Sequence, residues 1–319
     1  MNELFVGYKA ADLTAEALHA GAVCHVLDIY HAHAIAKVFP GAAVICTPHL
    51  PETAADGGAW DTVRLRTGPK LASGELALDL LQECVRLCGG VAALKRREGE
   101  SGRLVLDYVG RERDRNDLLD KVRDRTDRVF RSDWTASVPN GPKLVFTSYP
   151  GCFCHRRLDE GGLALAEVVS RELAERESAA GLSLLDMGCG CGLVGLLVAT
   201  RFEGMKVTLV DSHTRAIEAA SENVRRFGVA AECVLADDGL PARAPGGFDL
   251  FVGNPPYYSD YRIAEVFLET AKRNLKPGGI CYTVCKNAAG LEPVQRRYFP
   301  EVEIIRRRGY AVLKSSNKE

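Results

Sequence analysis

The amino-acid sequence predicts an α/β fold that consists of two tandem, doubly wound, Rossmann-like sheets. The main observation is that residues 141–319 alternate short apolar runs with helical patterns, which is typical of parallel strands joined by helices. A fainter version of this alternation occurs in the first half of the chain. A last pair of apolar runs predicts an antiparallel hairpin that closes the second sheet.

The elements of the second half are predicted from apolar runs of strand length and from apolar residues at helical spacing. We expect strands at Ser183–Met187, Lys206–Asp211, Glu232–Ala236, Asp249–Gly253 and Gly279–Cys285, and helices at Leu193–Arg201, Thr214–Phe227 and Ile263–Leu275. The closing hairpin pairs Val302–Ile305 with Tyr310–Lys314. Such sheets bind ligands outside the carboxyl ends of their strands, so functional residues are expected at that edge.

The first half of the chain looks like a copy of the second that has lost its ligand site. Val26–Phe39 aligns with Leu184–Leu197, and Trp60–Gly90 aligns with Phe248–Gly279. Self-similarity on this scale indicates an internal duplication of the fold. The first copy lacks a glycine-rich loop, and it has Arg-Thr-Gly-Pro where the second has Asn-Pro-Pro-Tyr.

The length of 319 residues suits two domains, and we place their boundary at the turn-forming cluster Pro139-Asn140-Gly141-Pro142. The predicted domains are residues 1–140 and 141–319. The region Lys95–Asp133 before the boundary is densely charged with both signs, which is typical of solvated helix faces and linkers. One strand pattern, Leu104–Val109, interrupts it.

The composition excludes several classes of protein. The 41 Lys and Arg residues nearly balance 42 Asp and Glu residues, so a nucleic-acid partner would have to bind a local basic patch. The chain begins without a signal-peptide pattern, and no apolar run reaches the ~18 residues of a membrane helix. Eleven cysteines without a repeated spacing indicate reduced thiols, and we expect a cytoplasmic protein.

The first functional motif is Asp186-Met187-Gly188-Cys189-Gly190-Cys191-Gly192, between a predicted strand and a predicted helix. Its alternating glycines allow the backbone to turn tightly and to approach a ligand. The pattern differs from that of dinucleotide enzymes and of phosphate-binding loops, because an acidic residue comes first. Asp211 ends the next strand, where a carboxylate can accept both hydroxyls of a ribose or can simply stabilise a helix N-terminus.

The second motif is Asn254-Pro255-Pro256-Tyr257, directly after a predicted strand. Two prolines after a strand often only end it. Here the Asn254 side-chain oxygen and the Pro255 carbonyl could accept both hydrogens of a planar NH2 group, which would direct its lone pair at an electrophile. Pro256 would keep that carbonyl rigid, and Tyr257 would offer a ring on which a base stacks.

These motifs resemble those of the class I S-adenosylmethionine-dependent methyltransferases that act on exocyclic amino groups. The segments SYPGCFCHRRLDEGG (148–162) and RGYAVLKSS (308–316) make the chain similar to the ribosomal RNA guanine-N2 methyltransferases of the "small methyltransferase domain" family. Larger members of that family also have a degenerate N-terminal copy of the fold. The resemblance covers Lys143–Ser316 closely and the first half more loosely.

The resemblance implies a role for each motif residue and S-adenosylmethionine as the cofactor. Gly188, Gly190 and Gly192 would line the methionine end of the cofactor, with Asp186 beneath them. Asp211 would bind the ribose and Asp237 the adenine amine, and Phe153 would close over the cofactor. Asn254 and Pro255 would bind the target NH2 group, with Pro256 behind them and Tyr257 against the base.

The acceptor is less closely defined, because the family commonly has Phe or Ile at the position of Tyr257. Adenine N6 in RNA or DNA and glutamine N5 in a protein are therefore alternatives to guanine N2, and an inactive cofactor-binding or RNA-binding module is the non-enzyme alternative. The expected partner is ribosomal RNA or an assembling ribosomal subunit, and no membrane is expected. Local basic patches could come from Arg156-Arg157, Arg296-Arg297 and Arg306-Arg307-Arg308. No metal site is expected, because the paired cysteines lack the spacing of a zinc knuckle.

Overall fold

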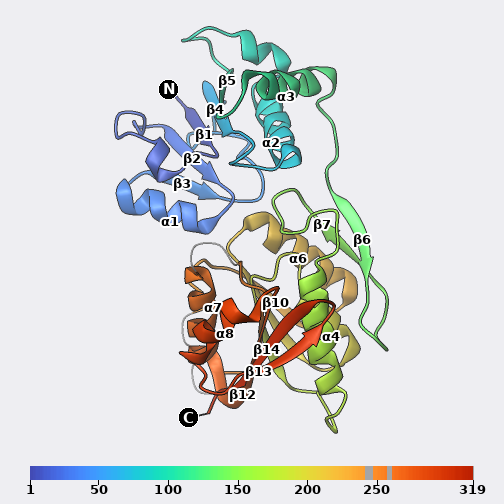
Figure 1. Ribbon diagram of the computed structural model, residues 1–319. Helices are drawn as coiled ribbons and strands as arrows, with labels where there is room; N and C mark the ends of the chain where they lie inside the picture. The colour runs from blue at the N-terminus through green and yellow to red at the C-terminus, as the bar shows by residue number, and fades with distance from the viewer. Residues whose placement is uncertain (241–246, 257–260, 319) are drawn as a thin grey trace. The chain divides into compact units, whose positions relative to one another are not determined.

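The computed structural model describes residues 1–240, 247–256 and 261–318, and it contains two compact units (Figure 1). The first unit comprises Met1–Arg131 together with His213–Arg215, and the second comprises Ser132–Ser212 and Ala216–Glu319. The first contains a parallel sheet and the second a mostly parallel one, each with helices on both faces, so the predicted α/β fold with two doubly wound sheets is confirmed. None of the helices in the described ranges is long and apolar enough to cross a membrane.

The first unit contains a five-stranded, fully parallel sheet in the order β3-β2-β1-β4-β5. Its strands are β1 (Glu3–Val6), β2 (Ala22–Val26), β3 (Ala43–Cys46), β4 (Thr62–Thr67) and β5 (Arg103–Tyr108). Its helices are α1 (Ile29–Val38), α2 (Gly74–Leu87) and α3 (Glu112–Asp124), with short 3-10 turns at Ala10–Asp12 and Val91–Lys95. Successive β1 residues alternate between two cores, since Leu4 packs with α2 and α3 and Phe5 packs with α1.

The second unit contains a seven-stranded sheet in the order β10-β9-β8-β11-β12-β14-β13. Its strands are β8 (Ser183–Met187), β9 (Lys206–Asp211), β10 (Ala231–Leu235), β11 (Phe248–Gly253), β12 (Leu275–Cys285), β13 (Glu303–Arg307) and β14 (Tyr310–Ser316). Its helices are α4 (Glu160–Leu173), α5 (Leu193–Arg201), α6 (Thr214–Phe227), α7 (Arg262–Asn274) and α8 (Ala288–Arg296). The antiparallel pair β13–β14 is the predicted closing hairpin.

Helices cover both faces of the second sheet because its central strands are apolar on both sides. Leu184 of β8 lies in the core with α4, α5 and α6, whereas its neighbour Leu185 lies in the core with α7 and α8. Figure 1 shows the same division, with α4 and α6 on one side of the strands and α7 and α8 on the other.

The two parallel cores have the same strand order, which supports the predicted internal duplication. The order β3-β2-β1-β4-β5 repeats as β10-β9-β8-β11-β12, so β4 and α2 correspond to β11 and α7, as the alignment of Trp60–Gly90 predicts. The alignment of Val26–Phe39 with Leu184–Leu197 is wrong by one strand–helix unit. Segment Ala22–Val38 is β2–α1 and corresponds to β9–α6, because the counterpart of β8 is the short strand β1 at the start of the chain.

Side chains fill the carboxyl edge of the first sheet. The buried Tyr8, just after β1, donates a hydrogen bond to Asp107 of β5. Arg66 of β4 forms an ion pair with Asp12 at 2.9 Å and lies over the Tyr8 ring. A ligand of a doubly wound sheet would bind at this edge, where the first sheet has these side-chain contacts and no glycine loop.

The second unit also has a two-stranded antiparallel sheet that the sequence patterns do not reveal. It pairs β6 (Ser132–Ala136) with β7 (Leu144–Ser148), and Trp134 stacks on Phe146 across the pair. The cluster Pro139-Asn140-Gly141-Pro142 lies in the turn between these strands, where Asn140 has a φ of 59°.

Candidate functional site

The carboxyl edge of the second sheet gathers the residues of both predicted motifs. Because the strand order is β10-β9-β8-β11, the residues that follow these strands lie along one edge. In spatial order they are Asp237 after β10, Asp211 at the end of β9, Gly188–Gly192 after β8, and Asn254 after β11. Asp186 lies one residue before the end of β8. Tyr257 lies outside the described residues.

Two glycines of the loop between β8 and α5 are glycine for different structural reasons. Gly188 has a φ of 66°, and a Cβ there would lie 2.7 Å from the ring of Phe267 in α7. Gly190 also has a positive φ, 55°, but a Cβ there would meet no atom within 4 Å. Gly188 therefore admits a buried aromatic ring, whereas the loop leaves open space beside Gly190.

Asp211 connects the end of β9 to this loop. Its Oδ2 accepts a hydrogen bond from the Gly190 N–H at 2.8 Å, and the Cys189 N–H donates to the Val210 carbonyl at 2.9 Å. A carboxylate has about four acceptor positions, so Asp211 can hold the loop and also accept from a ligand hydroxyl. These two hydrogen bonds thus hold the glycine loop against the end of β9.

Asp186 is buried beneath the loop. Its Oδ2 accepts a hydrogen bond from the Gly195 N–H in the first turn of α5, at 2.8 Å. Burial raises the pKa of this carboxyl to about 7, the Gly195 hydrogen bond lowers it, and the charges of Asp211 and Asp159 raise it further. Removing Asp186 from water outweighs its single hydrogen bond, so the folded protein retains a proton on it that the unfolded chain loses.

Replacing Asp186 by Asn is expected to remove a pH dependence of stability. Since the pKa rises from 3.8 unfolded to about 7 folded, the wild-type free energy of unfolding falls by up to about 1.4 kcal/mol per pH unit across that window. The Asp186→Asn protein lacks this loss. Its free energy of unfolding, relative to that of the wild type, should therefore increase from pH 5 to pH 7 and then level off. Urea unfolding at several pH values, without added ligand, measures the difference; an advantage independent of pH would contradict the burial effect.

Asn254 contacts Asp159, a residue of the segment 148–162 for which the sequence motifs predict no role. Its Nδ2 donates a hydrogen bond to Oδ2 of Asp159 at 2.9 Å, although the two residues are 95 positions apart. Asp159 is the N-cap of α4 and accepts the Gly161 N–H at 3.0 Å with its other oxygen. Pro255 is buried and Pro256 is half-buried. Only the fold brings Asp159 and Asn254 together, so no local pattern could reveal the contact.

Asn223 is a second polar residue that the motifs miss. It is fully buried in α6, and its Nδ2 donates to the carbonyls of Cys191 at 2.9 Å and Thr147 at 3.0 Å. Its Oδ1 accepts the Thr147 N–H at 2.9 Å, so it attaches the glycine loop to β7. A polar residue in helical register with the buried Ala216, Ala219 and Ala220 is the signal that could have identified it.

The remaining predicted residues differ in exposure. Phe153 is 68% exposed before α4, and Asp237 is half-buried. The loop thiols of Cys189 and Cys191 are buried, and burial raises the pKa of both far above that of a free cysteine. Within residues 1–240, 247–256 and 261–318, no group of three or more His, Cys, Asp or Glu side chains is arranged to hold a metal ion.

Several arginines of the predicted basic clusters form ion pairs within the second unit. Arg307 and Arg308, at the turn of the closing hairpin, both pair with Glu167 of α4, and Arg308 also pairs with Glu160 at 2.7 Å. Arg296 pairs with Glu292 at 2.8 Å. The contacts of Arg307 and Arg308 attach the hairpin to α4, so the arginines at its turn have a structural role.

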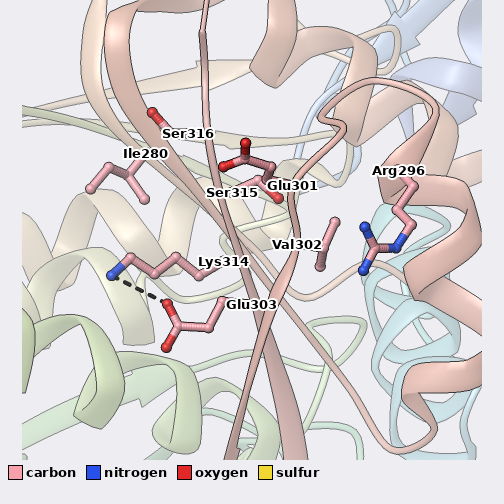
Figure 2. Close-up of a pocket in the computed structure, with 8 residues that line it drawn as sticks. All are labelled: Ile280, Arg296, Glu301, Val302, Glu303, Lys314, Ser315 and Ser316. Atoms are coloured by element: carbon pink, nitrogen blue, oxygen red, sulfur yellow. Dashed lines mark ion pairs between the residues drawn. The ribbon is translucent and has the colours of Figure 1, made fainter.

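A surface pocket of about 440 Å³ lies away from this edge (Figure 2). It is lined by residues of β12, β13 and β14, including Lys314, which forms an ion pair with Glu303 at 3.7 Å. Ile280 in its wall pairs with Ser316, whereas the carboxyl end of β12, Cys285, pairs with Ala311. The pocket therefore lies at the middle of β12, away from its carboxyl end, and does not include the motif residues.

Comparison with solved structures supports the two-unit fold. The structure matches a T. thermophilus 16S rRNA N2 methyltransferase, solved in complex with AdoMet and guanosine, over 100% of this chain and 88% of that one. The TM-score is 0.79, and the sequences are 19% identical. This similarity shows that the two proteins share a fold.

Curated relatives match nearly half of the chain in sequence. A protein named ribosomal RNA small subunit methyltransferase C from Pseudomonas aeruginosa (strain UCBPP-PA14) is 32% identical over 160 residues, which are 49% of this chain and 46% of that protein. The Hahella chejuensis protein of the same name is 38% identical over 140 residues, which are 43% of this chain and 38% of that protein. The match thus spans about half the length of these relatives or less. Residues 143–314, more than half of the chain, match the family described as methyltransferase small domain. The chain therefore belongs to the methyltransferase small domain family.

Proposed function

We propose that this protein is an S-adenosylmethionine-dependent methyltransferase that modifies an exocyclic amino group, the N2 of a guanine in ribosomal RNA. The observation that carries the proposal is the order of residues along one sheet edge. Asp211 and the glycine loop are next to each other, and Asn254 follows the adjacent strand β11. A cofactor bound by Asp211 and the glycine loop would be next to an amine bound by Asn254. We assign this chemistry to the predicted domain 141–319, in a cytoplasmic protein.

The loop is suited to the cofactor in shape and charge. The open space beside Gly190 would admit the methionine end, between Gly188 and Gly192 and above Asp186. S-adenosylmethionine is cationic at its sulfonium and amine groups, so carboxylates at this edge favour it. Asp211 would bind the ribose, and Asp237 would bind the adenine amine. Phe153 is exposed and would bury apolar surface by packing on the cofactor, which is favourable.

The chain's own residues would position the acceptor amine. The Asn254 Oδ1 and the Pro255 carbonyl would accept its two N–H groups, which localises the nitrogen lone pair. Pro256 restricts the backbone that presents this carbonyl, and Tyr257 would stack on the base. When bound, the cofactor supplies an electrophilic methyl group. The amine proton becomes acidic only after alkylation, so the residues described here need not include a general base.

Ribosomal RNA, free or in an assembling subunit, is the proposed substrate because the curated relatives are named as ribosomal RNA methyltransferases. Adenine N6 or glutamine N5 would use the same hydrogen bonds, and Tyr257 suits those acceptors as well. An inactive module is disfavoured, because the second sheet retains both motifs at an open edge whereas side chains fill that edge of the first. The first unit would then serve to dock the RNA.

Transfer of a labelled methyl group identifies the acceptor directly. The purified protein is incubated with tritiated S-adenosylmethionine and ribosomal subunits from cells that lack it, and the RNA is digested to nucleosides. We expect the label in N2-methylguanosine. Label in N6-methyladenosine, or in protein alone, would replace the proposed acceptor. Undetectable transfer, together with no calorimetric binding of S-adenosylhomocysteine, would contradict the enzymatic function.

A further inference from the structure

The contact between Asp159 and Asn254 defines which way the Asn254 amide points. A side-chain amide has a donor end and an acceptor end, which are nearly indistinguishable in shape. A carboxylate only accepts hydrogen bonds, so Asp159 selects the NH2 end of Asn254 at 2.9 Å. The carbonyl oxygen Oδ1 is then at the end of the amide that does not contact Asp159.

The start of α4 is built to allow this contact. A Cβ at Gly162 would lie 2.6 Å from Oδ2 of Asp159, and a Cβ at Gly161 would lie 3.4 Å from Nδ2 of Asn254 and 3.1 Å from the Tyr310 ring. Only glycine at position 162 leaves that carboxylate oxygen in place. The helix start, Asp159 and Asn254 therefore pack without space for side chains between them.

We propose that Asp159 is a positioning residue for methyl transfer: it keeps Oδ1 of Asn254 directed at the acceptor amine. This inference rests on the proposed function and adds a residue to it. An inverted Asn254 amide would present NH2 to the substrate NH2, so that two donors face each other. A hydrogen bond to a charged group contributes about 1.5–3 kcal/mol, which is sufficient to favour one orientation by tenfold or more.

The Asp159→Asn variant tests the orientation without changing the size of the side chain. Its new amide has one acceptor oxygen for two donors, the Gly161 N–H and the Asn254 NH2. If that oxygen caps the helix, the NH2 group of the new amide binds Oδ1 of Asn254 and inverts the Asn254 amide. We expect kcat to fall at least tenfold, while the KM for RNA and the affinity for S-adenosylhomocysteine stay within about twofold.

The Asp159→Ser variant separates positioning from helix capping. Serine is a preferred N-cap residue and can accept the Gly161 N–H, but its one oxygen cannot also bind Asn254. If Asp159 served only to cap α4, the Asp159→Ser variant would keep both the Tm and the kcat of the wild type. We expect the Tm to stay within a few degrees and kcat to fall at least fivefold. If both Asp159 variants keep kcat within twofold of the wild type, the proposal is wrong.

Exchanging the two side chains provides a rescue. In the double variant Asp159→Asn/Asn254→Asp, the amide introduced at position 159 caps the helix with its oxygen and donates its NH2 to the carboxylate introduced at position 254. The other oxygen of that carboxylate then accepts from the substrate amine. We expect kcat at least tenfold above that of either single variant. An exchange without rescue would overturn the proposal.

A second double variant tests whether Asp159 acts through Asn254. In an Asn254→Ala background, Asp159→Asn should cause no further loss of kcat, because the amide that Asp159 orients is already absent. Losses that multiply in the double variant would mean that the two residues act independently, and they would also overturn the proposal.

The side-chain amide can also be observed without any activity. In protein labelled with 15N-asparagine, the Asn254 NH2 signals are assigned by their loss in Asn254→Ala. A downfield amide proton that moves upfield in Asp159→Ser is expected, and unchanged signals would contradict the contact. A wild-type protein that transfers no methyl group yet shows this signal would refute the proposed function alone. An active wild type whose kcat does not respond to Asp159 would refute this inference alone.

Discussion

Asn254→Ala is expected to lower kcat for methyl transfer by about 100- to 1,000-fold, the cost of removing one hydrogen-bonding group that acts on the transition state. The variant loses the oxygen that would accept from the target NH2, so the nitrogen lone pair stays delocalised. Asn254 lies after β11, and the loop and Asp211 lie at the ends of β8 and β9, so we expect cofactor binding to be kept in this variant. Single-turnover transfer of a tritiated methyl group to ribosomal RNA measures the loss.

Two control measurements test whether the loss of kcat comes from weaker cofactor binding or from misfolding. Calorimetry with S-adenosylhomocysteine should give an affinity within twofold of the wild type, because the glycine loop and Asp211 are unchanged. Near-UV circular dichroism should show that the tertiary packing is retained. An Asn254→Ala protein with near wild-type turnover would show that the proposed mechanism is wrong.

Asp211→Ala is expected to weaken the binding of S-adenosylhomocysteine about 100-fold. The variant loses the proposed hydrogen bonds to the ribose, and hydrogen bonds to a charged group contribute about 1.5–3 kcal/mol each. It also releases the Gly190 N–H, which Asp211 accepts at 2.8 Å, so the loop loses a support. Isothermal titration calorimetry measures the change in affinity directly.

Glu232→Ala provides the matched control for charge. Glu232 is exposed in the first half of β10, away from the carboxyl edge, and its removal changes the net charge equally. We expect its affinity for S-adenosylhomocysteine to stay within twofold of the wild type. An equal loss in both variants would mean that Asp211 acts only through long-range charge. An Asp211→Ala protein with unchanged affinity would exclude it from the ribose site.

The parallel strands of the second half and three of its helices could be predicted closely, whereas helices α4 (Glu160–Leu173) and α8 (Ala288–Arg296) were not predicted. The bounds of β8, α5, β9 and α6 match the predicted ranges, because each is an apolar run or an amphipathic period that ends in a turn. β12 begins at Leu275, four residues before the predicted Gly279, because the strand includes Pro277 and two glycines that the pattern treats as a turn. The hairpin β6–β7 was not predicted, because β6 has only two apolar residues, Trp134 and Ala136, and the three apolar residues of β7 do not alternate with polar ones.

The first half could be predicted only in outline. Strands of four residues, such as β1 and β3, are too short for a period to be recognised, and the one-unit error in the alignment of Val26–Phe39 follows from missing β1. The candidate site shows the same limit. Motif residues close in sequence were identified, whereas Asp159 acquires its relation to Asn254 from a contact over 95 positions.

The filled edge of the first sheet has a thermodynamic consequence. A ligand stabilises only the part of a protein that binds it, by about 2.7 kcal/mol at a concentration one hundred times its Kd. In the first unit, the contact of Tyr8 with Asp107 lies where a ligand would bind, so under the proposed function that unit would fold without one. The second unit, with open space beside Gly190, would gain this stabilisation from the proposed cofactor. The two halves of one duplicated fold would therefore respond differently to starvation: one keeps a constant stability, and the other loses part of its own when the cofactor is scarce.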